Sequence, residues 1–208
     1  MAELKRYFRS VLAETRRHLA PEFAQSLSLQ IQNNLLASSI SASAASVVLY
    51  APIQNEVDTG LLLSSWLASG KAVFLPRVAR DRVSTEIVQV FGPDDLAGSA
   101  VGIPEPHGEA VTTPLERPVL IVPGVAFSSN GDRIGRGGGH YDRFISQQGP
   151  ALRVGLAYSF QLLDDLPRDE WDQRMDFIIT ETAVHDCRPA REPVRVQAEG
   201  DLPRCNSQ

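Results

Sequence analysis

Hydrophobic residues recur with two different periods along the chain. Before residue 46 they recur every three or four positions, which predicts one helix over the first twenty residues and a second helix that begins near Pro21. After that point, short apolar or alternating runs rich in β-branched residues predict strands. The predicted strands cover residues 46–52, 71–78, 85–91, 118–124, 151–158 and 175–181.

Three more helices are predicted between these strands. One runs from Asp58 or Thr59 to Ser69, one begins near His140, and a short one spans residues 160–166. Because strands alternate with helices, the sequence predicts an α/β fold with helix-sheet-helix layers and a largely parallel central sheet.

The chain divides into a long structured part and a short tail. Residues 1–185 are expected to form a single α/β domain. Within it, residues 92–117 are rich in proline and glycine, which predicts mostly loop. Residues 186–208 have no hydrophobic periodicity and are expected to be a flexible tail.

Two amphipathic helices are predicted at the N-terminus. Their expected apolar stripes are Leu4, Phe8, Val11, Leu12 and Leu19 in the first helix, and Phe23, Leu27, Ile31 and Leu35 in the second. In the first helix Lys5, Arg9 and Arg16 fall within roughly 40° of one another and flank the stripe.

Charge and composition exclude several classes of function. With 20 basic and 25 acidic residues, the net charge of −5 argues against a general nucleic-acid-binding protein. We expect no membrane association, since no apolar run approaches ~18 residues and the charged N-terminus does not resemble a signal peptide. The two cysteines, Cys187 and Cys205, are too few for a disulfide framework, so we expect a reducing, cytoplasmic setting.

The glycine-rich loop between a predicted strand and the helix near His140 is the strongest candidate for a binding site. Glycines at 135 and 137–139 expose backbone N–H groups, and Arg133 and Arg136 add guanidinium donors, which together suit a phosphate-bearing ligand. The loop matches neither GxxxxGK[ST] nor GxGxxG. The alternative interpretation is a flexible strand-to-helix turn without a ligand.

The loop belongs to a longer pattern. Residues 123–143 follow P-G-x-A-F-x-x-x-G-x-R-[IL]-G-x-G-G-G-x-Y-D-R, which resembles the signature of the 5-formyltetrahydrofolate cyclo-ligases. Other blocks resemble that family in the same order: Lys5-x-x-x-Arg9, Glu56-Val57-Asp58-Thr59, Gly102-Ile103-Pro104-Glu105-Pro106, and Trp171-Asp172 followed by Met175-Asp176 and Thr180-Glu181.

The resemblance implies an ATP- and Mg²⁺-dependent enzyme that converts 5-formyltetrahydrofolate, with or without a polyglutamate tail, into 5,10-methenyltetrahydrofolate. The formyl oxygen attacks the γ-phosphoryl group of ATP and ADP leaves. N10 then closes the ring on the formyl carbon, and phosphate departs. The resemblance also implies an architecture similar to the NagB/RpiA/CoA-transferase-like proteins, and a monomer or weak homo-oligomer.

Residue roles transfer from the family onto matching positions. Lys5 and Arg9 are expected to bind ATP phosphates, and Glu56 and Glu105 to bind the folate. The residues expected to cradle ATP are Arg133, Ile134, Gly135, Arg136, Gly137, Gly138, Gly139, His140 and Tyr141. Arg136 and Tyr141 are the expected catalytic residues, with Arg136 stabilising charge on the transferred phosphoryl group, and Asp142 is the expected Mg²⁺ ligand.

Simpler structural interpretations stay open for the same residues. Lys5 and Arg9 also suit a solvated helix face, and Asp142 also suits the first turn of a helix. Glu56 also suits an acidic residue beside the Asp58/Thr59 helix cap. Glu105 lies between two prolines, which also suits a residue of a rigid loop. Trp171 suits stacking on a ligand ring, but it is expected to be a core or hinge aromatic residue.

A departure from the family pattern motivates one further hypothesis, and analogy of fold alone motivates another. Ser128 occupies a position where the family usually has Asp, so a carboxylate near the expected metal is missing unless Asp132 replaces it. That change motivates an alternative function, a non-catalytic folate- or nucleotide-binding protein that acts as a sensor or partner-binding module. An isomerase-like or acyl-CoA-handling protein ranks last, because no catalytic base is identified.

Overall fold

A seven-stranded sheet forms the centre of the computed structural model, which describes residues 1–79, 84–98 and 104–189. The strand order is β12-β11-β9-β6-β1-β2-β3, and the five inner strands are parallel while β12 and β3 are antiparallel edges. The strands are β1 (Ser46–Val48), β2 (Ala72–Val78), β3 (Thr85–Val90), β6 (Val119–Val122), β9 (Leu152–Leu156), β11 (Phe177–Ile179) and β12 (Val184–Asp186).

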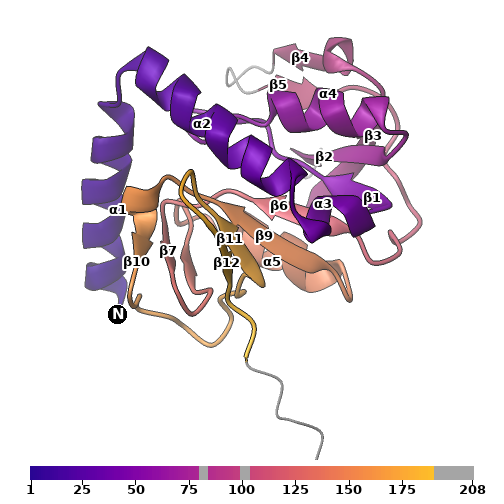
Figure 1. Ribbon diagram of the computed structural model, residues 1–208. Coiled ribbons are helices and arrows are strands. Elements are labelled where there is room, and N and C mark those ends of the chain that lie inside the picture. The colour runs from indigo at the N-terminus through magenta and orange to yellow at the C-terminus, as the bar shows by residue number, and fades with distance from the viewer. Residues whose placement is uncertain (80–83, 99–103, 190–208) are drawn as a thin grey trace, which may run out of the picture.

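Helices cover both faces of this sheet because successive strand residues point to opposite sides. Helices α2 (Pro21–Leu36), α3 (Ser39–Ser43) and α4 (Gly60–Ala68) lie over one face, where Trp66 packs with Val47 and Val73 (Figure 1). On the opposite face, α5 (His140–Gln147) packs Phe144 against the cluster that contains Val48. The predicted layered α/β fold with a largely parallel sheet is confirmed.

A smaller sheet lies beside the main one and carries the first helix. Its order is β10 (Leu162–Leu163), β7 (Ala126–Ser128) and β8 (Arg133–Ile134), and α1 (Ala2–Arg17) runs past β7 and β10 in Figure 1. Leu12 of α1 packs with Ile134 and Leu166 in a separate apolar cluster. This contact places the N-terminal helix next to the glycine-rich loop.

The secondary structure differs from the prediction at three places. The predicted helix over residues 160–166 is instead a 3₁₀ turn, η2 (Ser159–Gln161), followed by strand β10. The expected loop at 92–117 contains a 3₁₀ turn, η1 (Pro93–Asp95), and the paired strands β4 (Leu96–Gly98) and β5 (Pro104–Pro106). Helix α3 was not predicted, because five residues are too few for a periodic signal.

The predicted apolar stripe of α1 is also partly wrong. Leu4 is 48% exposed and Val11 is 43% exposed, whereas Lys5, Leu12 and Arg16 are buried. The helix turns its basic residues toward the protein because carboxylates and carbonyls there satisfy their charges. In α2, Ile31 and Leu35 are buried as predicted, but Phe23 is 56% exposed.

Strand β12 crosses the predicted boundary between the domain and the tail. Strand β12 extends to Asp186, one residue beyond the predicted domain end, so residue 186 belongs to the sheet. Residues 190–208 of the predicted tail lie outside the described part of the chain, and the division itself stays a prediction. Among the described residues, no helix is both long and apolar enough to cross a membrane.

Candidate functional site

A cleft of about 940 Å³ opens where the chain leaves β6 and β1 and where α5 begins. Helix α1 forms one wall of this cleft, which is lined there by Lys5, Arg6 and Arg9. The cleft is lined by six cationic residues, Lys5, Arg6, Arg9, Arg133, Arg136 and Arg143, and by four acidic ones, Glu56, Asp142, Asp169 and Asp172. This local excess of positive charge, in a chain with a net charge of −5, favours an anionic ligand.

The glycine-rich loop runs along the cleft and ends at the N-terminus of α5. Gly137 has φ +108° and Gly139 has φ +65°, both in the left-handed region that favours glycine. The loop therefore presents backbone rather than side chains to the cleft. Arg9 ties α1 to this loop, since its Nε donates a hydrogen bond to the Gly135 carbonyl over 2.8 Å.

Glu56 lies between two arginines on the opposite wall. Its Oε1 is 3.6 Å from Nη2 of the fully buried Arg16 and 3.2 Å from Nε of Arg136. Burial lowers the pKa of Arg16, and the charge of Glu56 opposes that effect. Arg136 is 43% exposed at its side chain and also donates to the amide oxygen of Gln54. Arg136 is thus held by two polar side chains but stays accessible from the cleft.

The turn that carries Glu56 is strained. Gln54 and Asn55 have φ values of 50° and 56°, an uncommon conformation for residues with a Cβ. The Asn55 amide donates to the carbonyls of Arg16 and Leu19 at the end of α1, which fixes the turn against that helix. Backbone strain of this kind persists where surrounding contacts compensate for it, as they do here.

Asp142 in the first turn of α5 is bound by a buried arginine. Arg133 Nη2 donates to Asp142 Oδ1 over 2.8 Å, and its Nη1 donates to the Pro123 carbonyl over 3.0 Å. The Gln173 backbone N–H donates to the same carboxylate oxygen. Arg133 therefore orients Asp142, and its own side chain is only 2% exposed.

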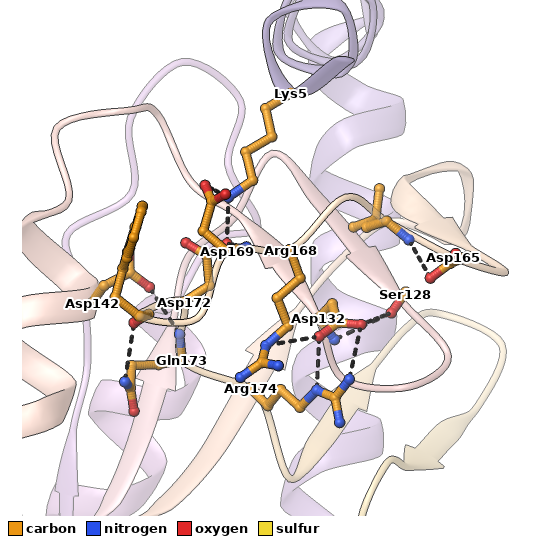
Figure 2. Close-up of polar contacts among 12 residues, drawn as sticks. Lys5, Ser128, Asp132, Asp142, Asp165, Arg168, Asp169, Asp172, Gln173 and Arg174 are labelled. Carbon is orange, nitrogen blue, oxygen red and sulfur yellow. Dashed lines mark hydrogen bonds and ion pairs between the residues drawn. The ribbon is translucent and has the colours of Figure 1, made fainter. Parts of the chain in front are cut away.

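Lys5 is enclosed by two carboxylates from the far end of the chain. Its Nζ is 2.7 Å from Asp169 Oδ2 and also contacts Asp172 Oδ2. Figure 2 shows the Lys5 side chain extending from the N-terminal end of α1 toward this pair. Burial opposes the charge of Lys5, but the hydrogen bonds to the two carboxylates outweigh it and raise the lysine pKa.

Tyr141 lies between the cleft and a smaller neighbouring pocket of about 140 Å³. Burial, reinforced by the charge of Glu56, raises the pKa of Tyr141 far above its usual value of 10.0. Its ring meets that of Phe144 edge-on, with centroids 6.3 Å apart. The phenol is therefore neutral at physiological pH and can donate a hydrogen bond.

The sequence comparison decides the family. The model of the 5-formyltetrahydrofolate cyclo-ligase family matches residues 1–181. The chain belongs to the 5-formyltetrahydrofolate cyclo-ligase family. The match spans all elements of the main sheet except β12 and includes every residue that lines the cleft.

Named relatives of the chain support the assignment. The chain is 31% identical over 179 residues to the 5-formyltetrahydrofolate cyclo-ligase of Escherichia coli K12, covering 84% of this chain and 98% of that protein. It is 25% identical to the mouse 5-formyltetrahydrofolate cyclo-ligase, covering 85% and 93%. The NMR structure of Aquifex aeolicus 5,10-methenyltetrahydrofolate synthetase is 34% identical and superposes with a TM-score of 0.79, covering 95% of this chain and 100% of that one.

The fold gathers most of the predicted site residues in one place. Lys5, Arg9, Glu56 and the whole stretch from Arg133 to Asp142 line the cleft. Glu105 does not, because strand β5 places it in the smaller pocket, which shares four lining residues with the cleft: Ala51, Val78, His140 and Tyr141. Gly102 and Ile103 of the same predicted block lie outside the described residues.

Several predictions about neighbouring residues need correction. Trp171 is 70% exposed on the cleft lining, so it is not a core residue. Asp132 is buried, faces arginines, and does not line the cleft. Ser128 is fully buried and is likewise absent from that lining. Asp132, the suggested replacement for the missing carboxylate, therefore lies outside the cleft lining.

Sequence reasoning missed most polar partners of the charged side chains in the cleft. Asp169, Gln54 and the Gln173 amide were not singled out, and Asp172 was noted only as part of a motif block. A possible signal was the pair of aspartates beside Trp171, but nothing in the sequence pairs them with a lysine near the N-terminus.

Proposed function

We propose that this protein converts 5-formyltetrahydrofolate into 5,10-methenyltetrahydrofolate with consumption of ATP. One observation carries the proposal. Folding brings Lys5 and Arg9 of α1 to the same cleft as the glycine-rich loop at 135–139, although more than a hundred residues separate them. Family membership supports the reaction. The cationic cleft, lined by the backbone of the glycine-rich loop, would hold the triphosphate.

The triphosphate of ATP would lie along the glycine-rich loop. Backbone N–H groups of residues 137–139 and the N-terminus of α5 favour negative charge there. Arg9 and Lys5 face the same space from α1. Lys5 would exchange one of its carboxylate partners for a phosphate oxygen. The side chain of Ile134 is buried in the apolar cluster with Leu12 and Leu166, so only the backbone of Ile134 is available to the nucleotide.

Mg²⁺ would enter with the nucleotide. In the described ranges, no three acidic, histidine or cysteine side chains lie close enough together to hold a metal ion. Mg²⁺ does not need such a cluster, because it keeps several waters and takes other ligands from phosphates. Asp142 suits the remaining contact, since Arg133 and Gln173 engage only one of its two carboxylate oxygens.

The residues around the phosphates would stabilise charge during the transfer. Bound ATP supplies a phosphoryl group that makes the formyl oxygen a leaving group. Phosphoryl transfer needs alignment and charge neutralisation more than a protein nucleophile. Arg136 fits this task, because it is exposed to the cleft and is tethered by Glu56 and Gln54 rather than buried.

The folate would occupy the side of the cleft that continues into the smaller pocket. Tyr141 lines both spaces and offers a neutral O–H group, so its proposed role is to donate a hydrogen bond and not to accept a proton. Glu56 lines the cleft and Glu105 lines the smaller pocket, and both would accept hydrogen bonds from N–H groups of a pterin.

The direct test is an absorbance assay. Purified protein is mixed with 5-formyltetrahydrofolate and MgATP, and formation of the methenyl product is followed. We expect an ATP-dependent rise with a turnover of ~1 s⁻¹ or more. Omitting ATP, or chelating Mg²⁺, should abolish it. A folded sample without any ATP-dependent rise contradicts the proposal.

A second candidate function is a folate- or nucleotide-binding protein without turnover. One observation favours it: the cleft cations Lys5, Arg133 and Arg136 each already have an acidic partner. A bound anion could replace these acidic partners reversibly, without any chemical step. Calorimetry separates the two candidates, because this second function predicts nucleotide binding without methenyl product.

A further inference from the structure

Both ends of the segment from Asp164 to Arg174 are hydrogen-bonded to the same turn. That turn connects β7 to β8. At the start of the segment, Ser129 N donates to the Leu163 carbonyl and Ser129 Oγ to the Asp164 carbonyl. At its end, Met175 N donates to the Gly131 carbonyl over 2.8 Å. Because both ends are fixed at the same turn, the segment is a closed loop of the Ω type.

Asp132, in the same turn, binds the segment through two arginines. Its Oδ1 is 2.8 Å from Arg174 Nε and 3.5 Å from Arg168 Nε, as Figure 2 shows. The Asp132 side chain is 5% exposed, while the arginines are 53% and 39% exposed. Because the Asp132 carboxylate is buried, losing the two arginines would leave its charge without a partner, so the contact holds the segment strongly.

The other side of the segment faces the cleft. Asp169 and Asp172 hold the Lys5 ammonium group, and the Gln173 N–H holds the Asp142 carboxylate. Within the segment, Asp172 Oδ2 also accepts from Asp169 N over 2.8 Å, which keeps the two carboxylates together. The segment thus connects Asp132, outside the cleft, with two residues inside it.

We propose that Asp132 is a positioning residue of this site: through Arg174 and Arg168 it fixes the 164–174 segment, and the segment in turn fixes Lys5 and Asp142. The inference rests on the proposed function, because its consequence is the placement of groups that meet the MgATP phosphates. Asp132 itself does not touch ligand. Its loss should therefore weaken binding of MgATP before it affects the chemical step.

The test compares Asp132→Asn with a matched control. The variant keeps the shape of the side chain and removes the charge. Asp186→Asn is the control, since Asp186 also pairs with an arginine but lies on the edge strand β12 and does not line the cleft. Hydrogen exchange of the 164–174 peptide and the affinity for a non-hydrolysable MgATP analogue are measured for both.

Asp132→Asn is expected to speed exchange in residues 164–174 and to weaken analogue binding about tenfold, the size typical of residues that support a ligand-binding group. Asp186→Asn should change neither quantity. The double variant Ser128→Asp/Asp132→Ser supplies a rescue, because it moves the carboxylate to position 128, where Ser128 Oγ is 3.5 Å from Asp132 Oδ2. It should restore slow exchange and analogue affinity.

Two results overturn the inference. Faster exchange with unchanged analogue affinity makes Asp132 a purely structural residue, and unchanged exchange removes the role altogether. If Asp132→Asn does not fold, Arg174→Gln tests the same contact from its exposed side, with the same two readouts. Wild-type protein that binds the analogue but forms no methenyl product contradicts the proposed function and leaves this test intact.

Discussion

The Lys5 ammonium group lies 2.7 Å from a carboxylate oxygen of Asp169, although 164 positions separate the two residues in the sequence. Asp172 binds the same ammonium group. One lysine between two carboxylates leaves a local excess of negative charge, so phosphate binding here requires the lysine to give up a partner. Through this contact, helix α1 and the segment that carries Asp169 and Asp172 line the same cleft.

Replacing Lys5 by alanine is expected to weaken ATP binding more than catalysis. The KM for ATP should rise about tenfold and kcat should fall less, because the removed charge contacts the bound triphosphate before and during transfer. Steady-state kinetics with varied ATP measure this split. An unchanged KM for ATP would show that Lys5 only anchors Asp169 and Asp172.

Replacing Arg136 by alanine should act mainly on turnover. We expect kcat to fall about 10²–10³-fold, as when a transition-state donor is removed, while the KM for 5-formyltetrahydrofolate changes little. Arg188→Ala is the control, since Arg188 is exposed and does not line the cleft. Equal losses in kcat and in both KM values would contradict the role given to Arg136.

Tyr141→Phe tests whether the phenol donates a hydrogen bond. Loss of one hydrogen bond to a charged group, worth roughly 1.5–3 kcal/mol, should lower kcat about 10-fold to 100-fold. The pKa of Tyr141 is raised far above 10.0, so the phenol stays protonated and the pH–rate profiles of the two proteins should have the same shape from about pH 6 to about pH 9. A fall in rate toward low pH seen only in the wild type would show that Tyr141 acts as a base.

Ser128→Asp should destabilise the protein without improving catalysis. The new carboxylate would lie buried beside Asp132, and two like charges at that distance disfavour folding by ~2 kcal/mol. Urea unfolding measures the loss, with Ser128→Ala as the matched control, where only the hydroxyl that binds Asp132 N is removed. A higher kcat in Ser128→Asp would show instead that position 128 reaches the metal.

Hydrophobic periodicity predicted the main sheet well. All six predicted strands contain an observed strand, and α1, α2, α4 and α5 begin close to their predicted starts. Periodicity needs several turns or alternations, so it misses α3, the edge strand β12 and the two- and three-residue strands of the smaller sheet. It also assigned the buried face of α1 to Leu4 and Val11, because it does not take account of carboxylates that accept a buried Lys5.

The candidate site was predictable where it is local in sequence. The glycine-rich loop, Arg136 and Asp142 stand within ten residues of one another, and their spacing indicates a ligand. The acidic partners were not predictable in this way. Asp169 meets Lys5, and Glu56 meets both Arg16 and Arg136, only because separate elements converge on one cleft.

The fate of the formyl oxygen tests the account most directly. 5-Formyltetrahydrofolate labelled with oxygen-18 in the formyl group is incubated with the protein and MgATP, and the released inorganic phosphate is analysed by mass spectrometry. Attack of the formyl oxygen on the γ-phosphorus predicts one labelled oxygen in each phosphate released. Unlabelled phosphate, formed together with the methenyl product, would contradict phosphoryl transfer to the folate in this cleft.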